Sequence, residues 1–413
     1  MKPGVVTERD VTVIRLPCWG RVVPAGGVVP WLVVGPAGEP VEPIARFLRD
    51  FAARGNRAGS VRSYCYALLR WWRWLKVIEV EWDQVTSAEV RDFVLWLGQA
   101  VKPRLAARTV SAATAGTVNP VTRKQCLDDS YQPRTVQHGN AVVRSFYEFW
   151  IEAGSGPLVN PVVLDRRGGR AHAHHNPLEP FAAGGRIRYN PKVPGRRRPR
   201  EIPDEQWKAL FAVLCSNRDR AIVALAVSNG ARASEILGIR GVDLDWGDQL
   251  VRVCRKGSGA AQWLPASPEA FVWIRLYLAG IGPLQPGEPL WRTLRRRADG
   301  GKSRGPLNYE ALRAVFRRVN VLLGANYSAH DLRHTCSLRM ARDEHLSLRD
   351  VQVILGHAHL STTADVYLAE DEQNVIRRVS QYLAARDQRQ PAPPVAAGYD
   401  PADLAVLLGG TAR

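Results

Sequence analysis

The chain has 413 residues, of which 46% are apolar and 23% are charged, a balance that excludes wholesale disorder and fibrous repeats. At the usual size of a domain, this length predicts two domains. Lysine and arginine number 57 against 39 acidic residues, which gives a net charge of +18 and a sequence pI near 10.1. This excess of positive charge indicates a polyanionic partner, and nucleic acid is the first candidate.

The spacing of the cysteines and the length of the apolar runs predict the cellular compartment of the protein. The six cysteines lie far apart without a CxxC pair, as expected for reduced thiols in a cytoplasmic protein. No apolar run reaches the roughly 18 residues that cross a bilayer, and the apolar stretch from Val22 to Val34 is interrupted by prolines and glycines. We therefore expect a cytoplasmic protein that is neither exported nor inserted in a membrane.

The N-terminal half is predicted to be helical. Residues 1–40 form an extension without an interpretable pattern, whereas residues 41–163 repeat apolar side chains at three-to-four spacing and predict about four helices. One helix begins near Thr86, because Glu89 follows at the spacing of a capping box. Residues 99–133 are rich in Ala, Thr, Arg and Pro and lack a sustained period, which predicts a long loop insertion.

A cluster of tryptophans and basic residues lies within this helical half. On a helix, Trp71 and Trp74 share the apolar side and are predicted to be core residues. Trp72 and Arg73 fall on another side and are predicted to be exposed, so that they could contact nucleic acid.

Two basic segments are further candidates for phosphate contacts. Residues 164–200 form a Gly/Pro/Arg linker, and within it residues 166–200 hold ten basic residues against one acidic residue, which supply +9 of the net charge. A solvated flexible run is the alternative interpretation, whereas a basic linker between two domains also suits a protein that closes around DNA. Residues 292–304 form the second basic segment. The residues predicted to contact DNA are Arg73, Arg196, Arg197, Arg198, Arg296 and Lys302.

The C-terminal half, residues 201–388, is predicted to be mostly helical with a small β-sheet. Alternating apolar residues after Leu250 indicate a hairpin or three-stranded sheet, with Lys256 on a basic, glycine-rich turn. From Phe271 the chain is predicted to be helical almost to Arg386. The tail, residues 389–413, begins with a proline-rich stretch and ends with a possible short docking helix.

Three short patches of this half carry residues that bind phosphate or transfer protons. The first, NGARASEIL, places Arg232 and Glu235 one turn apart, which by itself is an ordinary helix start. The second, SAHDLRH, places His330 and Arg333 on one helix face. The third, LGH, is followed ten residues later by Tyr367.

Taken in this order, the patches resemble the motifs of the tyrosine recombinase (phage integrase) family over roughly Pro203 to Arg386. The motifs are NGARASEILGIRGVDLDW, SAHDLRHTCSLRM and LGHAHLSTTADVY. The stretch from Val41 to Pro161 resembles the core-binding domain of that family more weakly. The resemblance implies a mainly α fold, in which a helical, SAM-like core-binding domain precedes a mixed α/β, mostly helical catalytic domain with a small β-sheet.

The resemblance also implies roles in cleaving a phosphodiester. Tyr367 is the expected nucleophile, which forms a 3′-phosphotyrosine and frees a 5′-hydroxyl. Arg232 and Arg333 are expected to clamp the scissile phosphate, since each offers a planar fork of donors. Lys256 is expected to protonate the 5′ leaving oxygen, although the turn that carries it varies in length across the family and Lys302 lies in another basic loop.

Two histidines complete the expected catalytic set. His330 can accept or donate a proton near neutral pH, and His357 is expected to hydrogen-bond the phosphate or orient the tyrosine. His330 and His334 also have the spacing of a helical zinc pair, but Asp331 stands where a metalloprotease needs glutamate. Because the phosphotyrosine conserves the energy of the broken bond, we expect neither a metal nor another cofactor.

The function predicted from the sequence is site-specific recombination or integration. By resemblance, a homo-tetramer acts on two double-stranded DNA segments through a Holliday junction, with sister recombinases or accessory proteins as possible partners. The extension, the insertion and the linker favour a mobile element over chromosome-dimer resolution. The alternatives are a catalytically silent DNA-binding accessory factor and a type IB topoisomerase-like relaxing enzyme. Residues 404–408 of the tail are expected to dock on a neighbouring subunit or on their own catalytic domain.

Overall fold

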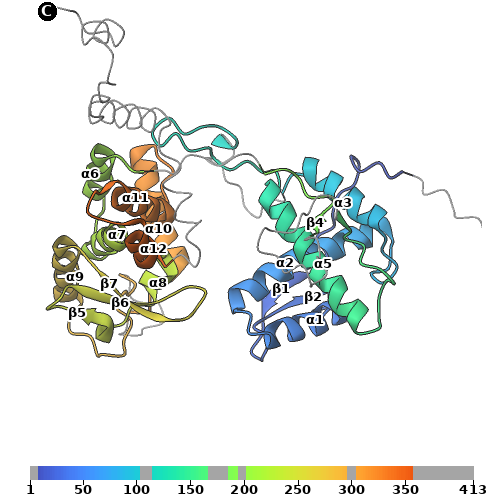
Figure 1. The fold of residues 1–413 in the computed structure, drawn as a ribbon, viewed down its shortest axis with the longest axis horizontal. Coiled ribbons are helices and arrows are strands. Elements are labelled where there is room, and N and C mark those ends of the chain that lie inside the picture. Colours follow the sequence, from blue (N-terminus) through green and yellow to red (C-terminus); the bar gives the residue numbers. More distant parts are fainter. Residues whose placement is uncertain (1–7, 103–113, 166–184, 194–200, 295–303, 357–413) are drawn as a thin grey trace, which may run out of the picture. The chain divides into compact units, whose positions relative to one another are not determined.

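The computed structural model describes residues 8–102, 114–165, 185–193, 201–294 and 304–356. The chain divides into two compact units, each with its own core (Figure 1). The first unit comprises Met1–Val118 and Gln125–Arg196, and the second comprises Asn119–Lys124 and Arg197–Arg413. A short stretch of the predicted insertion therefore belongs to the C-terminal unit.

The first unit is built from helices, as the apolar periodicity predicts. Its third helix begins with the predicted capping box: the Thr86 hydroxyl accepts a hydrogen bond from the Ala88 amide at 3.2 Å, and the Glu89 carboxylate accepts one from the Thr86 amide at 2.9 Å. The described helices of this unit include α1 (Glu42–Ala53), α2 (Ala58–Ile78), α3 (Ser87–Gln99) and α5 (Pro133–Glu152).

Helix α2 lies at the centre of this unit and is buried on more than one side. Trp71 and Trp74 are fully buried, as predicted. The prediction that Trp72 is exposed is wrong: it is 7% exposed, because its ring packs against Trp82 and Phe146. A prediction based on one apolar stripe fails for a helix such as α2, because neighbouring elements cover it on several faces.

The prediction that Arg73 is exposed is also wrong, since this residue is partly buried. Its guanidinium donates hydrogen bonds to the Trp19 carbonyl at 2.6 Å and the Gly20 carbonyl at 2.9 Å. These bonds tie α2 to the N-terminal extension, a structural task that the sequence did not indicate.

The N-terminal extension contributes to this fold as well. Strands β1 (Arg21–Pro24) and β2 (Trp31–Val34) pair as an antiparallel hairpin beside α2 (Figure 1). Val33 of β2 is fully buried in the core. A second, very short pair joins β3 (Leu164–Asp165) and β4 (Arg186–Ile187).

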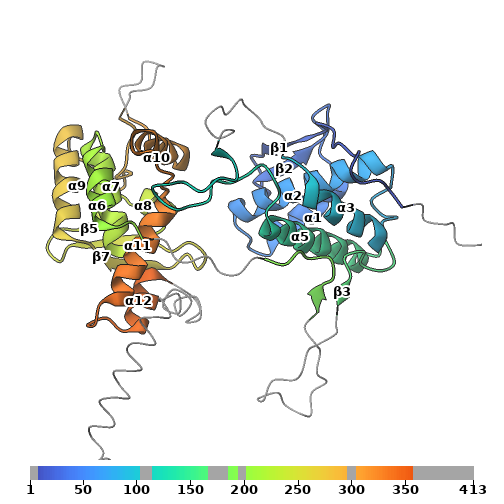
Figure 2. The same ribbon diagram turned by 90° about the horizontal axis from the view of Figure 1, so that it is seen from above.

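The second unit combines packed helices with a small antiparallel sheet. Helices α7 (Asn217–Asn229) and α9 (Pro268–Ile281) lie side by side in both views (Figures 1 and 2). The three strands have the order β5-β6-β7, with Val251 opposite Leu264, which confirms the predicted sheet. The elements are α6 (Asp204–Ala212), α7 (Asn217–Asn229), α8 (Ala233–Leu237), the 3-10 helix Gly241–Asp243, β5 (Leu244–Asp245), β6 (Leu250–Cys254), β7 (Ala261–Pro265), α9 (Pro268–Ile281), α10 (Tyr309–Leu323), α11 (Ala329–Arg342) and α12 (Leu348–Leu355).

The expectation of continuous helix from Phe271 onward is wrong between α9 and α10. Gly282 follows α9 with a φ of +89°, and the described residues 283–294 and 304–308 form no helix. Prolines at 283, 286 and 289 lack the amide protons that a helix needs. This segment instead makes isolated bridges from Pro289 to Arg240 and from Arg292 to Pro306.

Within the part of the chain that the structure describes, no helix has the length and apolar character to cross a membrane.

We predict that Tyr147→Phe lowers the free energy of unfolding by about 1–3 kcal/mol. Tyr147 is fully buried, and its hydroxyl oxygen accepts the hydrogen bond of the Trp71 indole N–H at 3.1 Å. The variant leaves that buried N–H without an acceptor. Urea unfolding followed by tryptophan fluorescence measures the change, and Tyr66→Phe is the control, because Tyr66 is 47% exposed. Equal stability of both variants would contradict the prediction.

Candidate active site

Four of the predicted catalytic residues line one cleft of the second unit. Arg232 precedes α8, Lys256 lies in the β6–β7 turn, and His330 and Arg333 lie on α11. Their cleft has a volume of about 780 Å³. The other lining residues are Ala233, Ser234, Leu237, Gly238, Leu307, Asn308, Tyr309 and Ala329.

The turn between α7 and α8 sets the position of Arg232. Gly230 ends α7 in the left-handed conformation, with a φ of +64°. A Cβ at this position would lie 2.7 Å from a methyl group of Leu355, so both the backbone and the space require glycine. The Arg232 amide and guanidinium then each donate a hydrogen bond to Glu235 at 2.9 Å.

Arg333 is buried and connects the ends of two helices. Its guanidinium donates hydrogen bonds to the carbonyl oxygens of Gly230 at 2.6 Å and Leu355 at 2.8 Å. Burial and the nearby charge of Arg232 lower the pKa of Arg333 to about 10, which leaves it protonated at neutral pH. Two guanidinium groups therefore contribute positive charge to the cleft, as an anionic group bound there would require.

The surroundings of His330 favour its neutral form. Burial lowers the pKa of His330, and the positive charge of Arg333 lowers it further, while Asp331 opposes the shift. At neutral pH this imidazole can accept a proton. Its ring lies edge-on to that of His334, with 4.4 Å between the ring centroids. Among the described residues, no group of three or more His, Cys, Asp or Glu side chains could hold a metal ion.

Glu235 supports more of the cleft than the sequence indicates. Its carboxylate is buried and accepts four hydrogen bonds: two from Arg232, one from the Lys256 amide at 2.9 Å and one from Arg255 at 3.2 Å. Burial by itself raises the pKa of this carboxyl, but the hydrogen bonds from Arg232 and Lys256 outweigh it and lower the pKa. Glu235 thus holds both the backbone and the guanidinium of Arg232 in place.

Lys256 lies at the exposed start of the turn between β6 and β7. Gly257 and Gly259 in this turn have φ values of +114° and +77°, which side chains with a Cβ rarely adopt. The amide of Lys256 is fixed by Glu235, and the residue lines the same cleft as Arg232 and His330.

Arg255 is a functional candidate that the sequence analysis missed. It is 5% exposed, and its guanidinium bonds to Glu235, to Gln262 at 2.8 Å and to the Ile354 carbonyl. A Cβ on Gly356 would lie 2.9 Å from its Nε atom. The alternation along β6 could have indicated that Arg255 is buried. Val251 and Val253 are buried, and residue 255 falls on the same face of the strand.

Asp331 follows His330 in the first turn of α11. Its carboxylate accepts hydrogen bonds from the Ser328 amide at 2.8 Å and the Ser328 hydroxyl at 2.7 Å, so it ties down the start of the helix. It also forms an ion pair with Lys124 at 2.9 Å. No local pattern could indicate that pair, because 207 residues separate its members.

The remaining predicted site residues cannot be placed in the cleft. Arg73 belongs to the first unit. The others lie outside the described residues: His357, Tyr367, Arg196, Arg197, Arg198, Arg296 and Lys302.

Comparisons with known proteins agree with this arrangement. Residues 200–374 match the Phage integrase family, and residues 44–116 match the Phage integrase, N-terminal SAM-like domain. Transposase A from transposon Tn554 of Staphylococcus aureus is 22% identical over 364 residues, which cover 85% of this chain and 93% of that protein. Tyrosine recombinase XerC of Staphylococcus saprophyticus is 28% identical over 250 residues, which cover 59% of this chain and 73% of that protein.

The fold has a counterpart among solved structures. The Tn1549 transposon integrase in complex with circular intermediate DNA aligns with a TM-score of 0.51 and 13% identity, covering 79% of this chain and 94% of that one. At this identity the likeness concerns the fold, and it confirms the predicted helical N-terminal domain and mostly helical C-terminal domain with a small sheet. With the two matched domains and the order of its motifs, the chain belongs to the phage integrase family of tyrosine recombinases.

Proposed function

We propose that this protein is a site-specific DNA recombinase or integrase that serves a mobile element. The observation that carries the proposal is the cleft in which Arg232, Lys256, His330 and Arg333 meet, although they come from three separate parts of the second unit. Family membership implies DNA strand transfer. The mobile element follows from the similarity to Transposase A of Tn554 along most of both chains.

The proposed reaction replaces one phosphoester bond by another. The hydroxyl oxygen of Tyr367 attacks the scissile phosphorus, the bond to the 5′-oxygen breaks, and a 3′-phosphotyrosine forms. Arg232 and Arg333 stabilise the charge that develops on the non-bridging oxygens. Lys256 gives a proton to the leaving 5′-oxygen, and neutral His330 accepts the proton that Tyr367 loses. His357 hydrogen-bonds the phosphate or orients Tyr367.

Rejoining reverses these steps on a new strand. A 5′-hydroxyl attacks the phosphotyrosine, the tyrosine leaves, and the phosphodiester is restored, so that no external energy source is needed. We propose that four copies on two DNA segments exchange strands pairwise through a Holliday junction. The net charge of +18 supports binding to the DNA backbone.

The two other functions predict different products. A silent accessory factor would bind DNA without forming a covalent adduct, and the presence of all the motif residues in the sequence speaks against it. A relaxing enzyme of the type IB kind would form the adduct and relax supercoils without joining two sites. Covalent trapping followed by a two-site recombination assay separates all three.

We predict that Tyr367→Phe abolishes covalent attachment to a nicked suicide substrate, because the variant loses the attacking oxygen. Binding to DNA should stay nearly unchanged. Denaturing gel electrophoresis of labelled DNA detects the adduct. The control is Tyr382→Phe, which should still form it, and an adduct in Tyr367→Phe would make another tyrosine the nucleophile.

Replacing Arg232 or Arg333 by Lys is expected to reduce the rate of cleavage by about a hundredfold or more. Each change keeps the charge but removes the fork of donors. Single-turnover cleavage measures the rate, and circular dichroism checks the fold of the Arg333 variant, whose buried guanidinium also bonds two carbonyls. The control is Arg275→Lys on the exposed side of α9. Near-normal cleavage by both variants would remove these arginines from the phosphate site.

Replacing Arg196, Arg197 and Arg198 by Gln is expected to flatten the dependence of affinity on salt. If each arginine neutralises one phosphate, the slope of log affinity against log salt changes by roughly one unit per lost contact. The change should be the same for specific and unrelated DNA, because backbone contacts carry no sequence information. An unchanged slope would identify this run as a solvated segment.

A further inference from the structure

Residues 119–124, which we call the insertion tip, form a turn with a defined shape. The backbone bridges from Val118 to Gln125 at its base, and the Asn119 amide donates a hydrogen bond to the Lys124 carbonyl at 2.8 Å. Inside the turn, the Asn119 side-chain oxygen accepts hydrogen bonds from the amides of Val121 and Thr122 at 3.0 and 2.9 Å. Such an asparagine turn needs no partner to form.

The insertion tip is nevertheless anchored to the rest of the second unit. The Asn119 side chain donates a hydrogen bond to the Gly324 carbonyl at 2.8 Å, just after α10. Lys124 and Asn326 form two hydrogen bonds. The lysine ammonium donates to the Asn326 backbone carbonyl at 3.1 Å, and the Asn326 side-chain amide donates to the Lys124 carbonyl at 3.3 Å. The Thr122 hydroxyl also bonds the Asn326 side chain. These contacts reach the segment that leads into α11.

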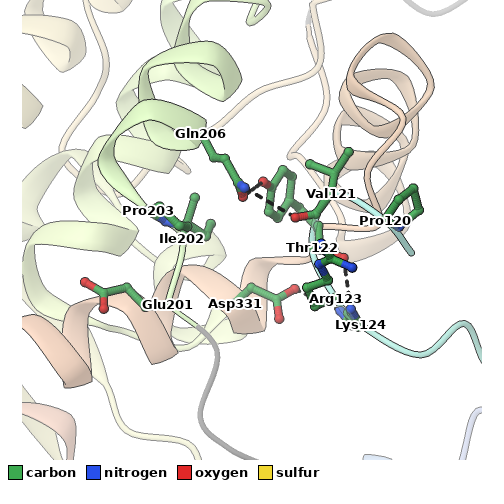
Figure 3. A pocket seen from close by; sticks show the side chains of 11 residues that line it. Pro120, Val121, Thr122, Arg123, Lys124, Glu201, Ile202, Pro203, Gln206 and Asp331 are labelled. Atoms are coloured by element: carbon green, nitrogen blue, oxygen red, sulfur yellow. Dashed lines mark hydrogen bonds and ion pairs between the residues drawn. The ribbon is translucent and has the colours of Figure 1, made fainter. Parts of the chain in front are cut away.

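A cavity of about 610 Å³ lies beside the anchored tip. Figure 3 shows the tip residues on one side of this cavity and Glu201, Pro203 and Gln206 on the other. Gln206 links the two sides, because its amide group donates to the Val121 carbonyl at 3.3 Å and its oxygen accepts from the Tyr327 hydroxyl at 2.6 Å. The tip is thus held from α6 as well as from the segment before α11.

Lys124 provides the charged contact of the tip. Its ammonium lies 2.9 Å from the Asp331 carboxylate, which is 5% exposed. A buried carboxylate is costly without a counter-charge. The same oxygen accepts the two hydrogen bonds of Ser328 that begin α11, and the preceding residue is His330. Lys124 therefore compensates the charge that organises the first turn of the helix bearing two predicted catalytic residues.

We propose that Lys124 is a positioning residue for strand cleavage, which holds the first turn of α11, and with it His330, through its ion pair with Asp331. This inference rests on the proposed function, since it assigns a task within that reaction. It also assigns a role to the insertion: part of the catalytic unit is supplied by a segment far away in the sequence.

The charges around His330 make the proposal testable by pH. Lys124 and Asp331 act on this imidazole in opposite directions: the lysine lowers the pKa of His330, and the aspartate raises it. Removal of the lysine charge should raise this pKa, and removal of the aspartate charge should lower it. Among the described residues, the charged or titratable groups that act on His330 or lie beside it are Arg232, Arg333, Asp331, His334 and Lys124, and Lys256 and Tyr309 line the same cleft.

The test compares Lys124→Met with Asp331→Asn in the full chain. We expect Lys124→Met to cleave a suicide substrate about tenfold more slowly and to bind a half-site as the parent does. The acid limb of its pH–rate profile should move to higher pH, because protonation of His330 becomes easier. For Asp331→Asn, which keeps an oxygen that can accept from Ser328, the limb should move to lower pH. A role in folding alone would not shift the two limbs in opposite directions.

Two variants of the same turn serve as controls. Arg123→Gln removes a positive charge from an exposed neighbour in the insertion tip and should change neither the rate nor the pH profile. Lys124→Arg keeps the charge and should retain most of the cleavage rate. If Arg123→Gln and Lys124→Met lose the same amount of cleavage rate, the effect comes from the net charge of the insertion tip, and the proposal is overturned.

A second measurement separates this inference from the proposed function. Histidine-selective NMR gives the pKa of His330 in the parent and in both variants, with His330→Gln to assign the signal. If the parent forms no adduct, the proposed function fails, while the NMR titration still tests the contact. If the parent cleaves and Lys124→Met matches it in rate, acid limb and His330 pKa, the insertion tip has no positioning role.

Discussion

The geometry of the cleft depends on the need to satisfy one buried negative charge, the carboxylate of Glu235. A carboxylate removed from water is tolerated when its lone pairs accept hydrogen bonds and a cation lies close by. Here the donors are the amide and guanidinium of Arg232, the guanidinium of Arg255 and the amide of Lys256. They come from the turn after α7 and from the β6–β7 hairpin, so a single charge fixes both segments against each other.

Two buried arginines extend this constraint to the end of α12. Arg333 bonds the Leu355 carbonyl and Arg255 bonds the Ile354 carbonyl. The last carbonyls of a helix have no partner within the helix and carry partial negative charge, so cations stabilise them. Both arginines thereby hold the point from which the chain continues to His357. Arg333, which brings positive charge to the cleft, thus also orders the backbone beside it.

The sequence predicts the features that depend on local periodicity and spacing. The capping box at Thr86, the helices of the first unit and the small sheet all follow from neighbouring residues, and the motif spacing brings His330 and Arg333 to one face. The burial of Trp72 could not be predicted, because it depends on helices that cover α2 from several sides. The partners of Lys124 could not be predicted either, since they are far away in the sequence and meet it through tertiary packing.

The anchored insertion tip makes the C-terminal unit discontinuous in sequence, since residues 119–124 precede the rest of it by more than 70 positions. A fragment that begins at residue 201 therefore omits part of its own fold. In such a fragment the Asp331 carboxylate loses its counter-ion, and Gln206 and Asn326 lose hydrogen-bond partners. Boundaries taken from the family motifs alone thus divide this protein at a place where its packing does not. The C-terminal unit, as its packing defines it, includes a segment of the N-terminal half.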